Sequence, residues 1–288
     1  MNVHHITPSG AVVYWNAGPT RRELLAERLR QINLEKFVPP ERTDASALRA
    51  TLKDHCDNRA QRRRGKDKLV QAHKRQSKHG FEVVDVERNE VFNDYSLDFA
   101  AKVVDGRVQV THGNADDGLL QEVFDVHKAT LTGASVGQAL VGVLAQLGGT
   151  ALRPSGGVYW ISEDALPTWE AVVNAVQSAA SEEGGNAVYM LRTLLDESGI
   201  RAVKDAIVSE ISDASASLAE EIRTGDLGEQ ALVKRQVTAA ALHYRVKQYE
   251  QILGEALDKL HETIRVAEEA AASAIAIKDS ADCYAGIF

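Results

Sequence analysis

The residues whose types most clearly suggest a chemical function lie between positions 59 and 78. Nine lysines and arginines stand there against a single acid, Asp67, so this segment carries about +8 in a chain of net charge −8. Such side chains neutralise phosphates and release counterions, which predicts salt-dependent, mostly sequence-independent binding to nucleic acid. The candidate binding residues are Arg59, Arg62, Arg63, Arg64, Lys66, Lys68, Lys74, Arg75 and Lys78.

Two other interpretations of this basic segment stay open. The rest of the chain carries about −16, so the segment could dock on an acidic protein partner or on the chain's own acids. It could also be a solvated surface segment without a function. No aromatic residue interrupts the cluster at 62–66, so base stacking of the kind used for single strands is not supplied locally.

Metal and cofactor chemistry has little support in the sequence. His55 and Cys56 are adjacent, and His73 and His79 follow in the basic segment, but neither Cys-x-x-Cys nor His-x-x-x-His spacing is present. Neighbouring cations would also oppose a divalent ion. The glycine pairs lack the context of a phosphate-binding loop. We therefore predict no metal site and no cofactor.

One set of polar residues is a candidate acid/base or metal site. It contains Asp116, Asp117, Asp125 and His127. Acidic residues just before a helix more commonly interact with the positive end of that helix. The sequence has no Gly-x-Ser-x-Gly motif, and Cys56 has no identifiable base. An enzyme without a recognisable motif is therefore the weakest of three hypotheses, and its catalytic residues are unknown.

The element that dominates the chain is helical and lies in the C-terminal third. Apolar residues recur every three or four positions over 200–222 and again over 239–267, which predicts two long helices joined at 224–228. The apolar spacing departs from a strict heptad, so we expect a nearly straight antiparallel hairpin. The second helix would run about 45 to 50 residues, roughly twice the first. The part of the second helix that extends beyond the first, about 257–276, is its excess. This excess would pack on the body, pack on another subunit, or stand in solvent.

This hairpin also offers a candidate partner surface. Tyr244 lies off the apolar stripe among basic residues, and the excess of the second helix adds apolar positions. We expect a protein partner or a second copy of the chain to bind there, through Tyr244, Arg245, Leu260 and Ile264.

The preceding residues predict an α+β body. Its small antiparallel or mixed sheet would include two strands that end in Tyr-Trp, at 10–15 and 156–160, paired with each other. Helix, helix and hairpin over 119–161 is also the order found in a winged helix. The predicted organisation is a body at 1–195, with the basic segment at 59–80 and a β-meander at 81–111, then the long helical hairpin at 196–280 and a tail at 281–288.

A resemblance accompanies these patterns. The Gly-x-Val-Tyr-Trp strand, together with Arg245-x-x-x-Tyr249-x-x-x-Leu253-Gly254 on a long helix, resembles hypothetical proteins of bacteria and their phages. Those proteins belong to families without an established role, so the resemblance implies no activity and no functional residue.

Composition sets the remaining limits. The chain has 288 residues, only two cysteines and no apolar run long enough to span a membrane, and its N-terminus does not resemble a secretion signal. We therefore expect a cytoplasmic protein without disulfides. The preferred hypothesis is a non-enzymatic interaction or assembly protein that uses the C-terminal hairpin for docking or oligomerisation. Nucleic-acid binding through 59–78 is the alternative.

Overall fold

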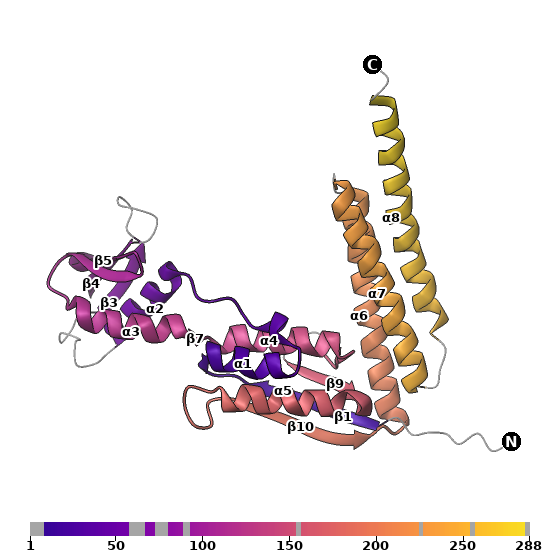
Figure 1. Ribbon diagram of the computed structural model, residues 1–288, viewed down its shortest axis with the longest axis horizontal. Coiled ribbons are helices and arrows are strands. Elements are labelled where there is room, and N and C mark those ends of the chain that lie inside the picture. Colours follow the sequence, from indigo (N-terminus) through magenta and orange to yellow (C-terminus); the bar gives the residue numbers. More distant parts are fainter. Residues whose placement is uncertain are drawn as a thin grey trace. The chain divides into compact units, whose positions relative to one another are not determined.

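The structure is a computed structural model that describes residues 9–57, 67–72, 80–88, 93–153, 157–224, 227–253 and 257–285. It confirms the α+β class, with small antiparallel sheets and a C-terminal helical region (Figure 1). The chain forms two compact units, each built from separate stretches. The bundle unit comprises Met1–Trp15, Val141–Ala171 and Val188–Phe288, and the sheet unit comprises Asn16–Leu140 and Val172–Ala187. These units therefore do not divide at residue 195.

A four-stranded sheet opens the bundle unit, in the order β10-β1-β9-β8. Its strands are β1 (Ser9–Asn16), β8 (Thr150–Ala151), β9 (Val158–Ser162) and β10 (Ala187–Leu194). The two Tyr-Trp strands, β1 and β9, pair antiparallel with Val12 opposite Trp160, which confirms their predicted pairing. Gly10 permits this approach, because a Cβ there would lie 2.1 Å from the carbonyl oxygen of Ile161.

Three long helices form the C-terminal part of the bundle unit: α6 (Glu197–Thr224), α7 (Glu229–Leu253) and α8 (Asp258–Ala285). The first predicted arm is α6, but the second is two helices and not one of 45 to 50 residues. The sequence places Gly254, a poor helix former, directly after α7. Figure 1 shows α8 alongside α6 and α7. The predicted excess at 257–276 therefore belongs mainly to α8 and packs within the chain, because the apolar stripe of α8 is buried against α6 and α7.

In the sheet unit, four antiparallel strands pack against two helices. The strands are β3 (Asp67–Ala72), β4 (Gly80–Arg88), β5 (Asn93–Val104) and β6 (Arg107–His112), in that order, and the helices are α2 (Asp44–Asp57) and α3 (Asp117–Ala129). Their core includes Leu48, Leu52, Phe99 and Phe124. The predicted meander at 81–111 is present, and β3 adds a strand from within the basic segment. Asp105 and Gly106 turn β5 into β6 with positive φ angles of 49° and 75°.

The remaining elements are short helices and strands. They are β2 (Thr20–Arg21), which pairs with β7 (Thr130–Leu131), and α1 (Arg22–Gln31), η1 (Glu35–Phe37), α4 (Gly133–Gln146), η3 (Glu163–Ala165) and α5 (Leu166–Ser178). The helix, helix and hairpin order of 119–161 is present, but the division between the two units falls inside α4, so these elements do not form one compact winged-helix unit. No helix in the described part of the chain has both the length and the apolar character needed to cross a bilayer.

Candidate interaction surfaces

The basic segment is only partly within the described residues. Lys68 lies on β3, which is at one edge of the sheet and pairs with β4 through Asp67 opposite Val86 to Ala72 opposite Phe81. Arg59, Arg62, Arg63, Arg64, Lys66, Lys74, Arg75 and Lys78 fall outside the described residues. The middle of the segment is therefore a strand and not a helix.

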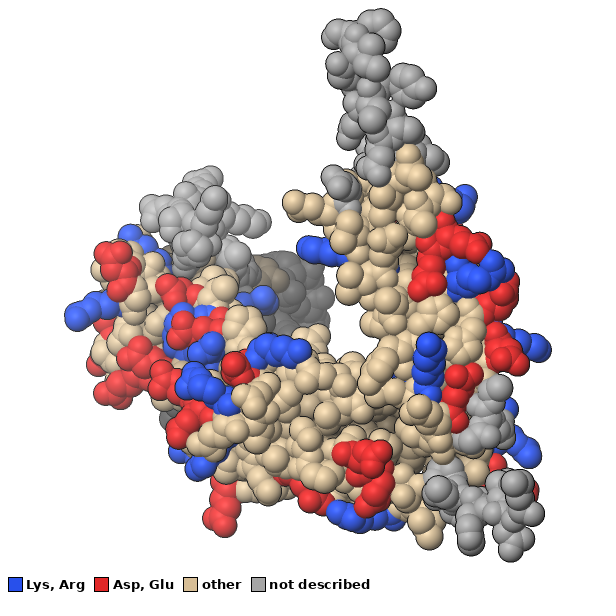
Figure 2. Space-filling view, turned by 45° about the vertical axis from the view of Figure 1, so that its right-hand side comes forward, with Lys and Arg blue, Asp and Glu red and all other residues tan. Residues whose placement is uncertain are grey.

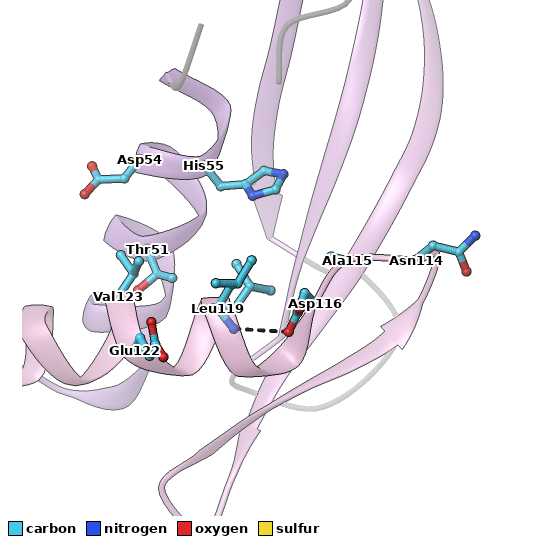
Figure 3. A pocket seen from close by; sticks show the side chains of 10 residues that line it. Thr51, Asp54, His55, Asn114, Ala115, Asp116, Leu119, Glu122 and Val123 are labelled. Carbon is cyan, nitrogen blue, oxygen red and sulfur yellow. Dashed lines mark hydrogen bonds between the residues drawn. The ribbon is translucent and has the colours of Figure 1, made fainter. Parts of the chain in front are cut away.

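A groove of about 510 Å³ lies between α2, α3 and the loop before α3 (Figure 3). Its lining contains three carboxylates and one imidazole, together with small and apolar side chains. In the view of Figure 3, Leu119 lies beside Asp116 at the start of α3 and below His55 of α2. The lining residues are Thr51, Asp54, His55, Asn114, Ala115, Asp116, Leu119, Leu120, Glu122 and Val123.

Several polar groups of this groove hold the local structure in place. The Thr51 hydroxyl donates to the carbonyl of Ala47 at 3.0 Å. One carboxylate oxygen of Asp116 accepts from the amides of Gly118 and Leu119, at 2.8 and 3.1 Å, and so caps α3. These contacts stabilise the first turn of α3 and the middle of α2, so the two polar groups serve the fold.

One candidate acid/base or metal site was considered from the sequence. The structure does not bring its residues, Asp116, Asp117, Asp125 and His127, together. Asp117 accepts from the amide of Val110 at 3.1 Å, and Asp125 accepts from the side chain of Gln121 at 2.8 Å. The acids therefore take the structural roles typical of a helix start and a helix surface.

His127 instead pairs with Asp54, which is 73 positions away in sequence. Its Nε2 lies 2.8 Å from an Asp54 oxygen, and its Nδ1 lies 3.4 Å from Nη1 of Arg42. Because a guanidinium can only donate, Nδ1 accepts and Nε2 carries the hydrogen toward Asp54. The imidazole thus links α3 to α2 along one side of the groove.

An apolar stripe runs along the exposed side of α3. Leu119 is 61% exposed and Val126 is 63% exposed, with Val123 between them also exposed. The stripe is separate from the buried pair Leu120 and Phe124, which pack into the core of the sheet unit. We call Leu119, Val123 and Val126 the α3 stripe. It is flanked by carboxylates that line the groove: Asp54, Asp116 and Glu122.

The candidate partner residues on the hairpin occupy three different environments. Tyr244 is 65% exposed, as a partner surface requires. Leu260 and Ile264 were expected on such a surface but are buried, because α8 folds against α6 and α7 and turns both side chains into the bundle core. Arg245 is mostly covered and forms an ion pair with Glu210 of α6.

Arg245 and Tyr249 join α7 to the turn before β8. Nη2 of Arg245 donates to the carbonyl of Gly149 at 2.6 Å and to Glu210 at 3.0 Å. The Tyr249 hydroxyl donates to the carbonyl of Gly148 at 2.6 Å and accepts from Thr150. Burial raises the pKa of Tyr249 to about 12. The spacing of four residues puts both side chains on one face of α7, so this motif serves the fold of the bundle unit.

Two histidines form a second contact between α7 and α8. Nδ1 of His243 lies 3.1 Å from Nδ1 of His261, and their rings stack. The outer nitrogens face Glu268 at 3.2 Å and Glu250 at 3.1 Å. Only one hydrogen fits between the two Nδ1 atoms, so one imidazole donates to the other there. In the described part of the chain, no cluster of three or more histidine, cysteine, aspartate or glutamate side chains could hold a metal ion.

A second apolar stripe on α7 faces away from the bundle core. Val233, Val237, Ala240 and Tyr244 follow each other in steps of four, three and four, and all are exposed, Val237 by 65%. We call these four residues the α7 stripe. Figure 2 shows charged side chains gathered along one edge of the bundle, with a broad uncharged area beside them.

Among the described side chains of α7, Lys234 and Lys247 are exposed cations beside the α7 stripe, and residues 230–249 contain no acid. The other two cations of this stretch are engaged with α6, Arg235 with Glu221 and Arg245 with Glu210. Over residues 230–249, α7 therefore presents an apolar stripe with a basic border of its own.

A family model described as a family of unknown function (DUF6744) matches residues 10–280. The chain belongs to the DUF6744 family. No curated protein and no solved structure matches the chain. The match extends from β1 into α8, so both exposed stripes lie within the part that the DUF6744 family shares.

Sequence reasoning missed the α3 stripe and most of the α7 stripe. The signal was present, because both sets keep steps of three and four residues. In α3, however, Leu120 and Phe124 offer a competing apolar face, and spacing alone does not say which face the core covers.

Proposed function

We propose that this member of the DUF6744 family is a non-enzymatic interaction or assembly protein of bacterial or phage origin that acts in the cytoplasm. Its docking element is the bundle of α6, α7 and α8. The observation that carries this proposal is the α7 stripe, an apolar face that remains exposed while α7 already buries a different face in the bundle core.

The spacing of the α7 stripe favours another helix as its partner. Val233, Val237, Ala240 and Tyr244 keep the alternating steps by which helices pack through knobs and holes. A row of exposed apolar side chains with a charged border is typical of a protein interaction site, whereas single exposed apolar residues are ordinary. Tyr244 adds a large amphipathic side chain of the kind that is enriched at interfaces.

Site-specific photocrosslinking tests the proposal directly. A photoreactive amino acid replaces Val237 in the full-length protein, expressed in its native host, and the covalent adducts are identified by mass spectrometry. We expect a specific adduct at 237 and none at Lys259, an exposed control position on α8. If position 237 yields no adduct beyond that control, the bundle is not a docking element.

Nucleic-acid binding is the second proposal, and the position of β3 favours it. Pairing with β4 fixes β3 at the edge of the sheet, and the sequence carries basic clusters both before and after this strand. The basic residues therefore adjoin, along the chain, a strand at the edge of the sheet unit, and basic residues of this kind bind phosphates.

A filter-binding titration against salt separates this second proposal from the first. Phosphate contacts predict a steep fall in affinity as salt rises, and charge reversal of Arg62, Arg63 and Arg64 should abolish binding. A triple reversal at Arg28, Arg30 and Lys36 makes the same change in net charge and serves as the matched control. Binding that is absent at low salt would contradict the nucleic-acid proposal.

A further inference from the structure

The two exposed stripes of this chain have matching geometry. The α3 stripe advances by four and three residues, and the α7 stripe by four, three and four. At 1.5 Å per residue they extend over about 10 and 16 Å of helix. Two helices that each present such a row can pack along a common seam, side chains of one between those of the other.

The borders of the two stripes carry opposite charges. Asp54, Asp116 and Glu122 lie beside the α3 stripe, at the groove between α2 and α3. Lys234 and Lys247 lie beside the α7 stripe. A seam between the two stripes would therefore bring carboxylates to ammonium groups, and this complementarity favours one pairing over others.

Pairing a stripe with its own copy is opposed by the same charges. Two α7 stripes would bring lysines together, and two α3 stripes would bring carboxylates together. We therefore infer that copies of this chain associate head to tail, with the α3 stripe of one copy packed on the α7 stripe of the next. This inference rests on the proposed docking role of the bundle and names a second copy as the occupant.

A head-to-tail contact leaves one free stripe at each end of a pair. The contact therefore repeats, and it produces rings if the rotation between copies closes and open chains if it does not. Two short stripes make a small interface, so association should be weak and should increase with protein concentration.

The test uses two full-length variants that each lose one stripe. The α3 variant carries Leu119→Ser, Val123→Ser and Val126→Ser, and the α7 variant carries Val233→Ser, Val237→Ser and Tyr244→Ser. All six side chains are exposed, so both variants should fold, which circular dichroism and urea unfolding verify. The matched control is Val208→Ser with Val266→Ser, on α6 and α8.

Sedimentation velocity and light scattering then give the mass of each sample. We expect the wild type and the control to exceed the monomer mass as concentration rises, and each stripe variant alone to remain monomeric. An equimolar mixture of the two variants retains one intact α3 stripe and one intact α7 stripe. It should form a one-to-one dimer that grows no further.

The alternative outcomes each overturn the inference. An α3 variant that still associates indicates an interface through α7 alone, and an α7 variant that still associates excludes the α7 stripe. A wild type that is monomeric at every concentration excludes self-association. If the wild type is monomeric but position 237 crosslinks to a different protein, this inference fails and the proposed docking function still holds.

The charge border gives a smaller, independent effect. Glu122→Lys should weaken the association of the wild type by about threefold, as expected for one exposed ion pair. Glu27→Lys, an exposed reversal on α1, should leave it unchanged. Equal effects of the two reversals would contradict the charge pairing.

Discussion

Helices α7 and α8 lie next to each other in sequence and in the bundle, yet they use their apolar residues differently. In α8, Leu260, Ile264, Ala267 and Ala271 form one buried stripe, and Arg265 pairs on the surface with glutamates of its own helix. In α7, one apolar stripe is buried and a second is exposed. The bundle needs only one stripe from each helix, so the second stripe of α7 is available for another task.

The largest expected difference between the two helices is in stability. Ile264→Ala in α8 removes a fully buried side chain and should lower the free energy of unfolding by about 4 kcal/mol. Val237→Ala in the α7 stripe should change it by less than about 0.5 kcal/mol, because that side chain is exposed. Urea unfolding measures both. Equal losses would place Val237 in the core and remove the basis of the proposed docking surface.

The next largest difference is expected between the stability losses caused by replacing one arginine of α7 and one of α8. Arg245→Ala removes a mostly covered cation from Glu210 and from the carbonyl of Gly149, and should destabilise the protein by about 3 kcal/mol. The matched change Arg265→Ala removes exposed ion pairs of α8 and should have little effect. Urea midpoints of the two variants make the comparison. A loss as small for Arg245 as for Arg265 would show that the contact with the turn before β8 contributes little.

Tyr249 gives α7 a dependence on alkaline pH. Burial raises its pKa to about 12, above the usual value of 10, so the folded protein disfavours the ionised phenol. The stabilisation is fully present below pH 10 and is lost as pH rises from 10 to 12. The wild type should therefore exceed Tyr249→Phe in stability by about 2 kcal/mol at pH 8, and this advantage should disappear by pH 12. Unfolding of both proteins across this range is the measurement, and a constant difference would be inconsistent with a buried neutral phenol.

The junction between the two helices carries the smallest effect. Glu250 of α7 accepts from the amide of Leu257, just before α8, at 2.7 Å, and this bond and His261 lower the pKa of the carboxyl. Its contribution is present above the ordinary carboxyl pKa and declines as pH falls through the lowered value. Glu250→Gln should cost about 1 kcal/mol at pH 7 and less at acidic pH. Thermal unfolding at several pH values tests this, with Glu27→Gln, an exposed glutamate of α1, as the control.

Local signals predicted much of the fold. The residues that end in Tyr-Trp predicted the strands β1 and β9 and their pairing, and the pattern over 81–111 predicted the meander that β4, β5 and β6 form. These elements depend on neighbouring residues, so a sequence carries their signal directly. The pairing of His127 with Asp54 could not be predicted in the same way, because it joins residues 73 positions apart through the packing of α3 on α2.

The C-terminal third shows most clearly which features follow from the sequence alone and which depend on tertiary packing. The sequence by itself determined that long helices dominate the C-terminal third and which side chains share a helix face, because the helical repeat is a local property. Only the tertiary structure decided that α8 turns back on α6 and α7, that Leu260 and Ile264 enter the core, and that the α7 stripe stays outside. The physical reason is that burial depends on which distant residues cover a face, and spacing along one helix does not contain that information.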